Sequence, residues 1–159
     1  MTVKMKDDWS AQSPKVADLF PGPFVHVGFD EVQTEQWAGD PAIRAALIAR
    51  GMTVEDYQTW CFSFVQKVLA GRGKRVLAWE EAYYGPVAKL RPPPGAVSQA
   101  WAKERFAAAG LNVGLPTIMT PAHFLYLDHL QKIEDHEPGL HWAGIISLER
   151  IPKIFLTRS

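Results

Sequence analysis

The sequence has little of what marks disulfide-stapled, zinc-binding or membrane proteins. Cys61 is the single cysteine among 159 residues, which excludes an internal disulfide, and no Cys/His spacing resembles a zinc site. No apolar run approaches the ~18 residues of a membrane helix, and the charged, polar stretch Met1–Ser10 shows no signal peptide. Net charge is also absent, since 17 basic and 17 acidic residues cancel. We therefore expect neither nucleic acid nor a membrane as a partner.

The residues that are present give an ordinary globular composition with many aromatic side chains. Hydrophobic residues make up 47% and charged residues 21%, which argues against disorder. The length predicts a single domain over residues 1–159. Six Trp, eight Phe and four Tyr are enough for either a large core or a sugar-binding surface.

Short apolar runs alternate with helical patterns, which predicts an α/β fold. Asp40 before Pro41, with a stop at Gly51, predicts a helix over residues 41–50. Thr53 with Asp56 predicts a capped helix over Val54–Ala70. Extended segments are predicted at Phe24–Phe29, Arg75–Trp79, Ala96–Trp101 and Leu111–Met119, and further helices at Ala102–Ala109 and from within Ser147–Phe155.

This order implies parallel strands, and in parallel sheets the chemistry gathers where strands end. Carboxylates and aromatic side chains follow every predicted strand, which is what a carbohydrate pocket needs. These groups are Asp30-Glu31, Trp79-Glu80-Glu81, Trp101 and Phe124-Leu125-Tyr126-Leu127-Asp128.

Four segments in order carry a resemblance to a known family. His26–Val32 resembles the active-site signature of family-20 glycoside hydrolases, the β-N-acetylhexosaminidases. Gly73–Glu81 is similar to the family's Trp-Asp-Glu strand, Val97–Trp101 to the next strand, and Phe124–Asp128 to its Tyr-Leu-Asp segment. The resemblance implies a (β/α)8 barrel, which needs about 250 residues. We therefore predict a partial (β/α)8 TIM-barrel-like domain, the middle of the barrel, with parallel strands and flanking helices.

The resemblance implies retaining, substrate-assisted hydrolysis of terminal β-linked N-acetylhexosamine, either GlcNAc or GalNAc, without a metal or organic cofactor. Glu31 would be the general acid and then the base, while Asp30 would hold the acetamido N–H. In an extended chain these neighbouring side chains would point to different sides. The implied substrate-binding residues are Trp79 and Trp101 as walls, Tyr126 as donor to the acetamido oxygen, and Asp128 as acceptor from sugar hydroxyls.

Two departures from the family pattern keep a second interpretation open. Phe29 occupies a position that is usually glycine, and we expect it to tilt the loop or narrow the sugar site. The family's early Arg and late Trp and Glu also have no match. The alternative function is a non-catalytic sugar-binding module or an inactive truncated remnant. The nearly continuous apolar runs Phe24–Phe29 and Val76–Trp79 are typical of strands buried on both faces, so an open part-barrel should self-associate or recruit a complementary chain.

Several conspicuous residues receive structural assignments instead. His26, inside an apolar strand, is predicted to be a buried supporting residue. Glu80 and Glu81 are predicted to be solvated or to support the site from behind. The tryptophans outside the motifs, Trp37, Trp60 and Trp142, are predicted to lie in the core.

Overall fold

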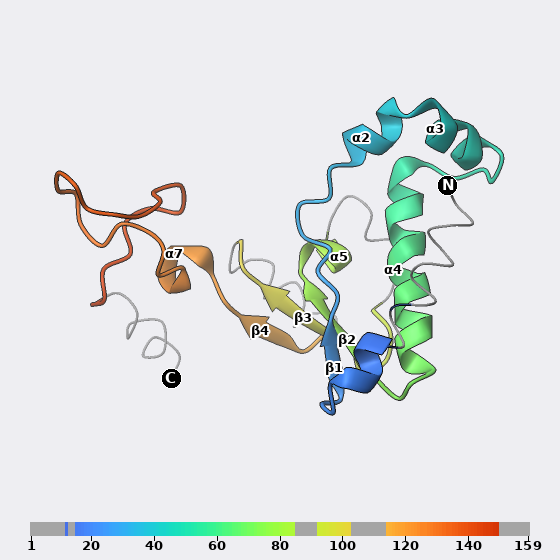
Figure 1. Ribbon diagram of the computed structural model, residues 1–159, viewed down its shortest axis with the longest axis horizontal. Coiled ribbons are helices and arrows are strands. Elements are labelled where there is room, and N and C mark those ends of the chain that lie inside the picture. Colours follow the sequence, from blue (N-terminus) through green and yellow to red (C-terminus); the bar gives the residue numbers. More distant parts are fainter. Residues whose placement is uncertain (1–11, 13–14, 85–91, 103–113, 150–159) are drawn as a thin grey trace.

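The computed structural model describes residues 12, 15–84, 92–102 and 114–149, and its strands lie side by side with the longest helix along one side (Figure 1). Most of the helix predicted at Ala102–Ala109 and most of the one predicted within Ser147–Phe155 lie outside these residues. The elements in chain order are β1 (Phe24–His26), α2 (Thr34–Gly39), α3 (Pro41–Ile48), α4 (Val54–Ala70), β2 (Arg75–Trp79), α5 (Glu81–Tyr84), β3 (Val97–Ala100), β4 (Thr117–Met119) and α7 (Ala122–Leu125).

The four strands form one parallel sheet in the order β1-β2-β3-β4. Val25 pairs with Val76, Ala78 pairs with Ser98, and Ala100 pairs with Met119. The strand order follows the chain, which is the arrangement of consecutive strands in a (β/α)8 barrel. The prediction of parallel strands with flanking helices is confirmed, although β1, β3 and β4 are shorter than their predicted runs.

The two capped helices begin where the sequence predicts. The Asp40 carboxylate accepts from the backbone of Ala42 and Ile43 at 2.7 and 3.1 Å, and α3 ends at Ile48. Thr53 and Asp56 form the reciprocal capping box that starts α4. Among the described residues, no helix is long and apolar enough to cross a membrane.

The core lies between α4 and one face of the sheet. Along β2 the burial alternates: Val76 and Ala78 are buried beneath α4, whereas Leu77 and Trp79 on the other face are only half-buried. The prediction of strands buried on both faces is therefore wrong for β2, because within the described residues nothing covers that second face fully. The core cluster comprises Ala17, Phe62, Val65, Leu69, Val76, Ala78, Tyr83, Ala96 and Leu115.

Candidate active site

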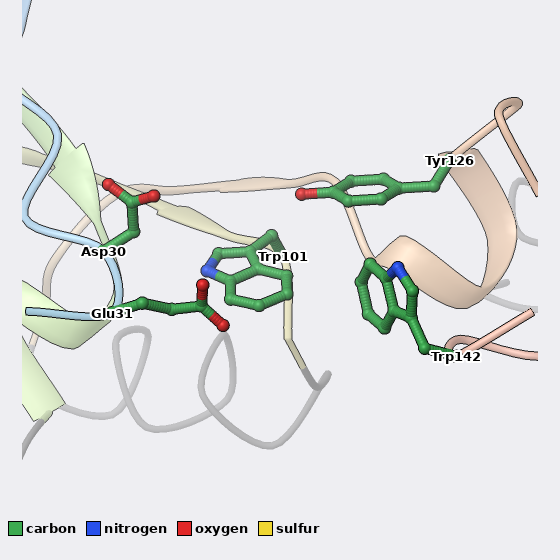
Figure 2. Close-up of a pocket in the computed structure, with 5 residues that line it drawn as sticks. All are labelled: Asp30, Glu31, Trp101, Tyr126 and Trp142. Atoms are coloured by element: carbon green, nitrogen blue, oxygen red, sulfur yellow. The ribbon is translucent and has the colours of Figure 1, made fainter. Parts of the chain in front are cut away.

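A pocket opens beyond the carboxyl ends of the strands, with two carboxylates on one side and aromatic rings on the other (Figure 2). Its volume is about 420 Å³, within the range of roughly 300–1,000 Å³ typical of small-molecule sites. Four of the six predicted site residues line it, although almost a hundred positions separate the first from the last. The lining residues are Asp30, Glu31, Trp101, Tyr126 and Trp142.

The carboxylates sit on a left-handed turn rather than on extended chain. Phe29 and Glu31 have φ of 73° and 43°, a region that non-glycine residues seldom occupy. The expectation of an extended chain at Asp30 and Glu31 is therefore wrong, although both side chains line the same pocket. The turn is tied to β2, because Gly28 O accepts from Trp79 N at 3.1 Å, and to its own strand, because His26 Nδ1 accepts from Gly28 N at 3.1 Å.

Phe29 turns its ring away from the pocket. The ring meets Phe62 of α4 edge-on, with centroids 5.1 Å apart, and packs against the hydrophobic core. The expectation that Phe29 narrows the sugar site is therefore wrong. The residue adopts the positive φ that suits glycine while its side chain extends the core.

Two adjacent glutamates behind the pocket hold its walls. Glu80 is fully buried, and its carboxylate accepts from Trp101 N at 3.1 Å and Ala102 N at 2.8 Å. Glu81 accepts from Glu31 N at 3.2 Å through Oε1 and from Trp101 Nε1 at 3.1 Å through Oε2. Burial raises the pKa of Glu81, partly offset by these two hydrogen bonds. The sequence predicts that each glutamate is either solvated or supports the site from behind. Solvation is wrong for Glu80, which is fully buried, and the supporting role describes both Glu80 and Glu81.

Tyr126 is a protonated donor facing the carboxylates. Its ring stacks on Trp101 with centroids 6.2 Å apart and planes 13° apart. Partial burial raises the pKa of Tyr126, and the nearby negative charges, first Glu80 and then Asp128, raise it further. The phenol therefore keeps its proton at neutral pH and can donate a hydrogen bond.

Two predicted sugar-binding residues lie outside the pocket lining. Trp79 is half-buried on the sheet and meets His26 edge-on, with centroids 4.9 Å apart. The Asp128 side chain is 60% exposed and contacts the buried His129, with Oδ1 3.3 Å from Nδ1. The structure thus gathers Asp30 and Glu31 with two of the four predicted substrate-binding residues.

His26 is exposed, which corrects the prediction of a buried histidine. Strand β1, which carries His26, is an edge strand, and among the described residues no strand lies on its other side. Desolvation lowers the pKa of His26, while the charge of Asp30 acts in the opposite direction. The neutral ring is the form that can accept the Gly28 N–H.

Trp142 is a pocket residue that the sequence did not reveal. It is 56% exposed, so the prediction that it belongs to the core is wrong, and it lies edge-on to Trp101 and Tyr126. Its loop is held from behind, because His129 Nε2 accepts from Ala143 N at 3.1 Å. No local motif signals this placement. Trp60 is likewise exposed, at 38%, and stacks between Tyr57 and Phe64.

Within the described part of the chain, no group of three or more His, Cys, Asp or Glu side chains could hold a metal ion. The arrangement instead offers two carboxylates, one phenol and two indole rings around one cavity. Such a set can hold a sugar ring against an apolar wall while a carboxyl group transfers a proton.

Comparison with known proteins gives a consistent family assignment. The sequence model of "Glycosyl hydrolase family 20, catalytic domain" matches residues 12–155. The chain is 35% identical over 137 residues to a beta-hexosaminidase of Vibrio furnissii, covering 86% of this chain and 22% of that protein. It is 33% identical over 139 residues to a beta-hexosaminidase of Porphyromonas gingivalis, covering 86% of this chain and 17% of that one. The chain thus spans about a fifth of the length of these relatives.

Solved structures agree with this assignment. The Vibrio harveyi GH20 exo-β-N-acetylglucosaminidase, in complex with N-acetylglucosamine, superimposes with a TM-score of 0.80 at 32% identity. That match covers 91% of this chain and 22% of the Vibrio protein. A Streptomyces plicatus β-hexosaminidase mutant in complex with GlcNAc gives a TM-score of 0.66 at 26% identity, covering 91% of this chain and 26% of that one.

Proposed function

The chain belongs to glycosyl hydrolase family 20, and on that premise we propose that its pocket binds terminal β-linked N-acetylhexosamine and hydrolyses it with the help of the substrate's own acetamido group. Its parallel strands and flanking helices are part of the family's α/β barrel. The observation that carries the proposal is the convergence of Asp30, Glu31, Trp101 and Tyr126 on one cavity. The N-acetylglucosamine bound by the Vibrio harveyi protein supports the same class of sugar here.

Glu31 is assigned the proton transfers. In the first step the acetamido oxygen bonds to the anomeric carbon while the glycosidic carbon–oxygen bond breaks, and the leaving oxygen takes the proton of Glu31. In the second step the Glu31 carboxylate removes a proton from water. The resulting nucleophile bonds to the anomeric carbon and opens the oxazolinium ring, which restores the acetamide and retains the configuration.

Asp30 and Tyr126 are assigned to the acetamido group. The Asp30 carboxylate would accept from the acetamido N–H and balance the positive charge that develops on the oxazolinium ring. The Tyr126 hydroxyl, protonated at neutral pH, would donate to the acetamido oxygen and aim it at the anomeric carbon. Both groups line the same cavity as Glu31, which supports a shared substrate.

The tryptophans are assigned to the apolar parts of the sugar. Trp101 and Trp142 stand almost perpendicular, with an interplanar angle of 81°, and form a corner against which C–H groups can pack. Asp128 and Trp79 remain proposed sugar-binding residues that would reach a ligand larger than the pocket itself. The Asp128 side chain is 60% exposed, and Oδ2, the oxygen that does not face His129, would accept from hydroxyl groups of such a ligand.

A second candidate is a sugar-binding module without catalysis. The observation that favours it is the exposure of both pocket carboxylates, Asp30 and Glu31, because a sugar bound there would keep contact with water on one side. Binding without turnover is the expected behaviour of such a module.

Hydrolysis of a chromogenic β-GlcNAc glycoside by the purified chain separates the two candidates. Release of the chromophore supports the enzyme, provided that the Asp30→Asn variant loses the activity. Affinity for GlcNAc without release supports the binding module. Equal affinity for glucose and GlcNAc, measured by calorimetry, would contradict both, since each depends on recognition of the acetamido group. A thiazoline that mimics the oxazolinium should bind more tightly than GlcNAc.

We also propose that the chain associates with itself or with a complementary chain that completes the barrel. Strands β1 and β4 are the edges of the described sheet, and each has one strand neighbour there. On β4 the side chain of Ile118 is 44% exposed, which leaves apolar surface at one of these edges. Open edges and exposed apolar side chains favour pairing with another chain.

A further inference from the structure

One carboxylate joins the two sides of the pocket. Glu81 Oε1 accepts from the backbone N–H of Glu31, fifty residues earlier, and Oε2 accepts from the indole N–H of Trp101, twenty residues later. Glu31 belongs to the turn after β1, and Trp101 follows β3. The bridge therefore spans three consecutive strand ends.

The bridge starts from a rigid base. Glu81 opens α5 directly after β2, and the preceding Glu80 is fully buried with its carboxylate bonded to the backbone of Trp101 and Ala102. Glu80 N also donates to Gln99 O at 3.0 Å. The backbone that carries Glu81 is thus fixed against β3.

The turn needs such a link because its conformation is unfavourable. Glu31 has a φ of 43°, a conformation that is unfavourable for a non-glycine residue and persists when surrounding contacts enforce it. The hydrogen bond to Glu81 acts on the amide of that same residue. The other oxygen acts on the indole N–H, which sets the orientation of the Trp101 ring.

We propose that Glu81 is a positioning residue that holds the Glu31 turn and the Trp101 ring at a fixed separation, and thereby sets the distance between the proton donor and the wall that receives the sugar. The proposal rests on the proposed function for the roles of Glu31 and Trp101. Glu81 itself does not line the pocket, so its effect passes through these two residues.

Hydrogen exchange of the Glu31 amide and the Trp101 indole tests the Glu81 bridge without an activity assay. In the wild type, the Trp101 indole N–H should exchange with solvent more slowly than that of Trp142, which is 56% exposed. Gln at position 81 keeps the size of the side chain but has one acceptor oxygen for two donors. Glu81→Gln should therefore speed exchange of the Glu31 amide or the Trp101 indole about tenfold, the value of one hydrogen bond.

A second variant at position 81 and a control variant at a distant glutamate complete the exchange experiment. Glu81→Asp keeps the charge and both oxygens but is one methylene too short to reach both donors, and it should speed exchange in the same way. Glu134→Gln removes an equal charge from an exposed pair with Lys132, and should leave both signals unchanged. Equal exchange of Trp101 and Trp142 in the wild type would overturn the proposal even if neither position-81 variant folds.

Leaving-group dependence tests the role in the reaction. A displaced proton donor harms substrates with poor leaving groups most, so Glu81→Gln should lower kcat/KM about tenfold more for such substrates than for activated ones. General damage to the fold would lower both alike and would overturn the proposal. If the wild type hydrolyses neither, the proposed function has failed. The affinity for the thiazoline then decides: a loss in Glu81→Gln supports the positioning role, and an unchanged affinity overturns it.

Discussion

Phe29 shows how one residue can serve two opposing demands. Its backbone takes a φ of 73°, which favours glycine, while its ring packs on Phe62, which requires an aromatic side chain. A glycine at this position would relax the backbone at the expense of the core contact. The site keeps its shape because the packing of the ring compensates the strain of the turn.

Two truncations at position 29 separate the strain of the backbone from the packing of the ring. Phe29→Ala and Phe29→Gly both remove the ring, and each should lower the free energy of unfolding by about 1–4 kcal/mol. Glycine should be the more stable of the two by about 1 kcal/mol, the reverse of its usual rank below alanine, because the φ is positive. Urea unfolding of both variants measures this difference. A more stable alanine variant would contradict the left-handed conformation.

Cys61 is a packed thiol rather than a reactive one. Burial in α4 raises its pKa to about 11, against a smaller opposite effect of its hydrogen bond with Tyr57. Labelling with a disulfide reagent at neutral pH should run about a hundredfold slower in the folded chain than in the same chain in urea, since the thiolate reacts. The rate should rise as the pH approaches 11. Comparable rates in the two states would show that the thiol is exposed.

Among the elements, those with local signals could be predicted from the sequence. Thr53 and Asp56 predict the start of α4, and Asp40 with Pro41 predicts the start of α3, because capping interactions act within a single helical turn. The helices α2, α5 and α7 have six, four and four residues and were not predicted, since they are too short for an apolar stripe to show. Of these short helices, α5 packs against β2, whereas α2 packs against α3 and α4.

The residues of the candidate site also divide into those that the sequence predicts and those that only the structure reveals. Asp30, Glu31 and Trp101 could be predicted because each follows a strand within a recognisable motif, and Tyr126, which follows α7, because it belongs to the Phe124–Asp128 motif. Trp142 could not, because its loop is placed by contacts with His129 and Leu130 rather than by its own sequence. The same limit explains Glu81, whose role is visible only once residues 31 and 101 are brought together.

The loop that carries Trp142 depends on a close backbone crossing at Gly139. A Cβ there would lie 2.7 Å from Leu130 N and 2.8 Å from His129 C, and its φ of 144° also disfavours other residues. Gly139→Ala should therefore displace the loop and weaken GlcNAc binding several-fold. Gly22→Ala, at a glycine with open space around its Cβ position, is the matched control. Calorimetric titration of both variants with GlcNAc makes the comparison, and unchanged affinity in Gly139→Ala would show that the loop does not shape the pocket.

At the scale of the molecule, the open sheet determines which apolar surface stays available to another layer or chain. Figure 1 shows α4 beside β1 and β2, while the chain after β4 leads away to α7 and the segment that bears Trp142. The second face of β2 is half-buried in the described residues. A part-barrel of this kind has apolar surface that a further layer or a second chain can cover.

Light scattering at increasing concentration tests the proposed association. The purified chain should show a mass above its 17.8 kDa, and Ile118→Lys should reduce the association by placing a charge on β4. Ile133→Lys, at a residue that is 84% exposed away from the strands, is the control and should leave the mass unchanged. A stable monomer with full turnover would contradict the account and would mean that the pocket is complete within one chain.

The most direct measurement of the central claim is the rate of the Glu31→Gln variant on β-GlcNAc substrates with poor leaving groups. The substitution keeps the shape of the side chain and removes its acidic proton, so the rate should fall by roughly 10² to 10⁴ while the affinity for GlcNAc stays near the wild-type value. Substrates with activated leaving groups should lose less in the first step. A wild-type rate for Glu31→Gln, with GlcNAc still bound in the pocket, would contradict the assignment of Glu31 as the acid.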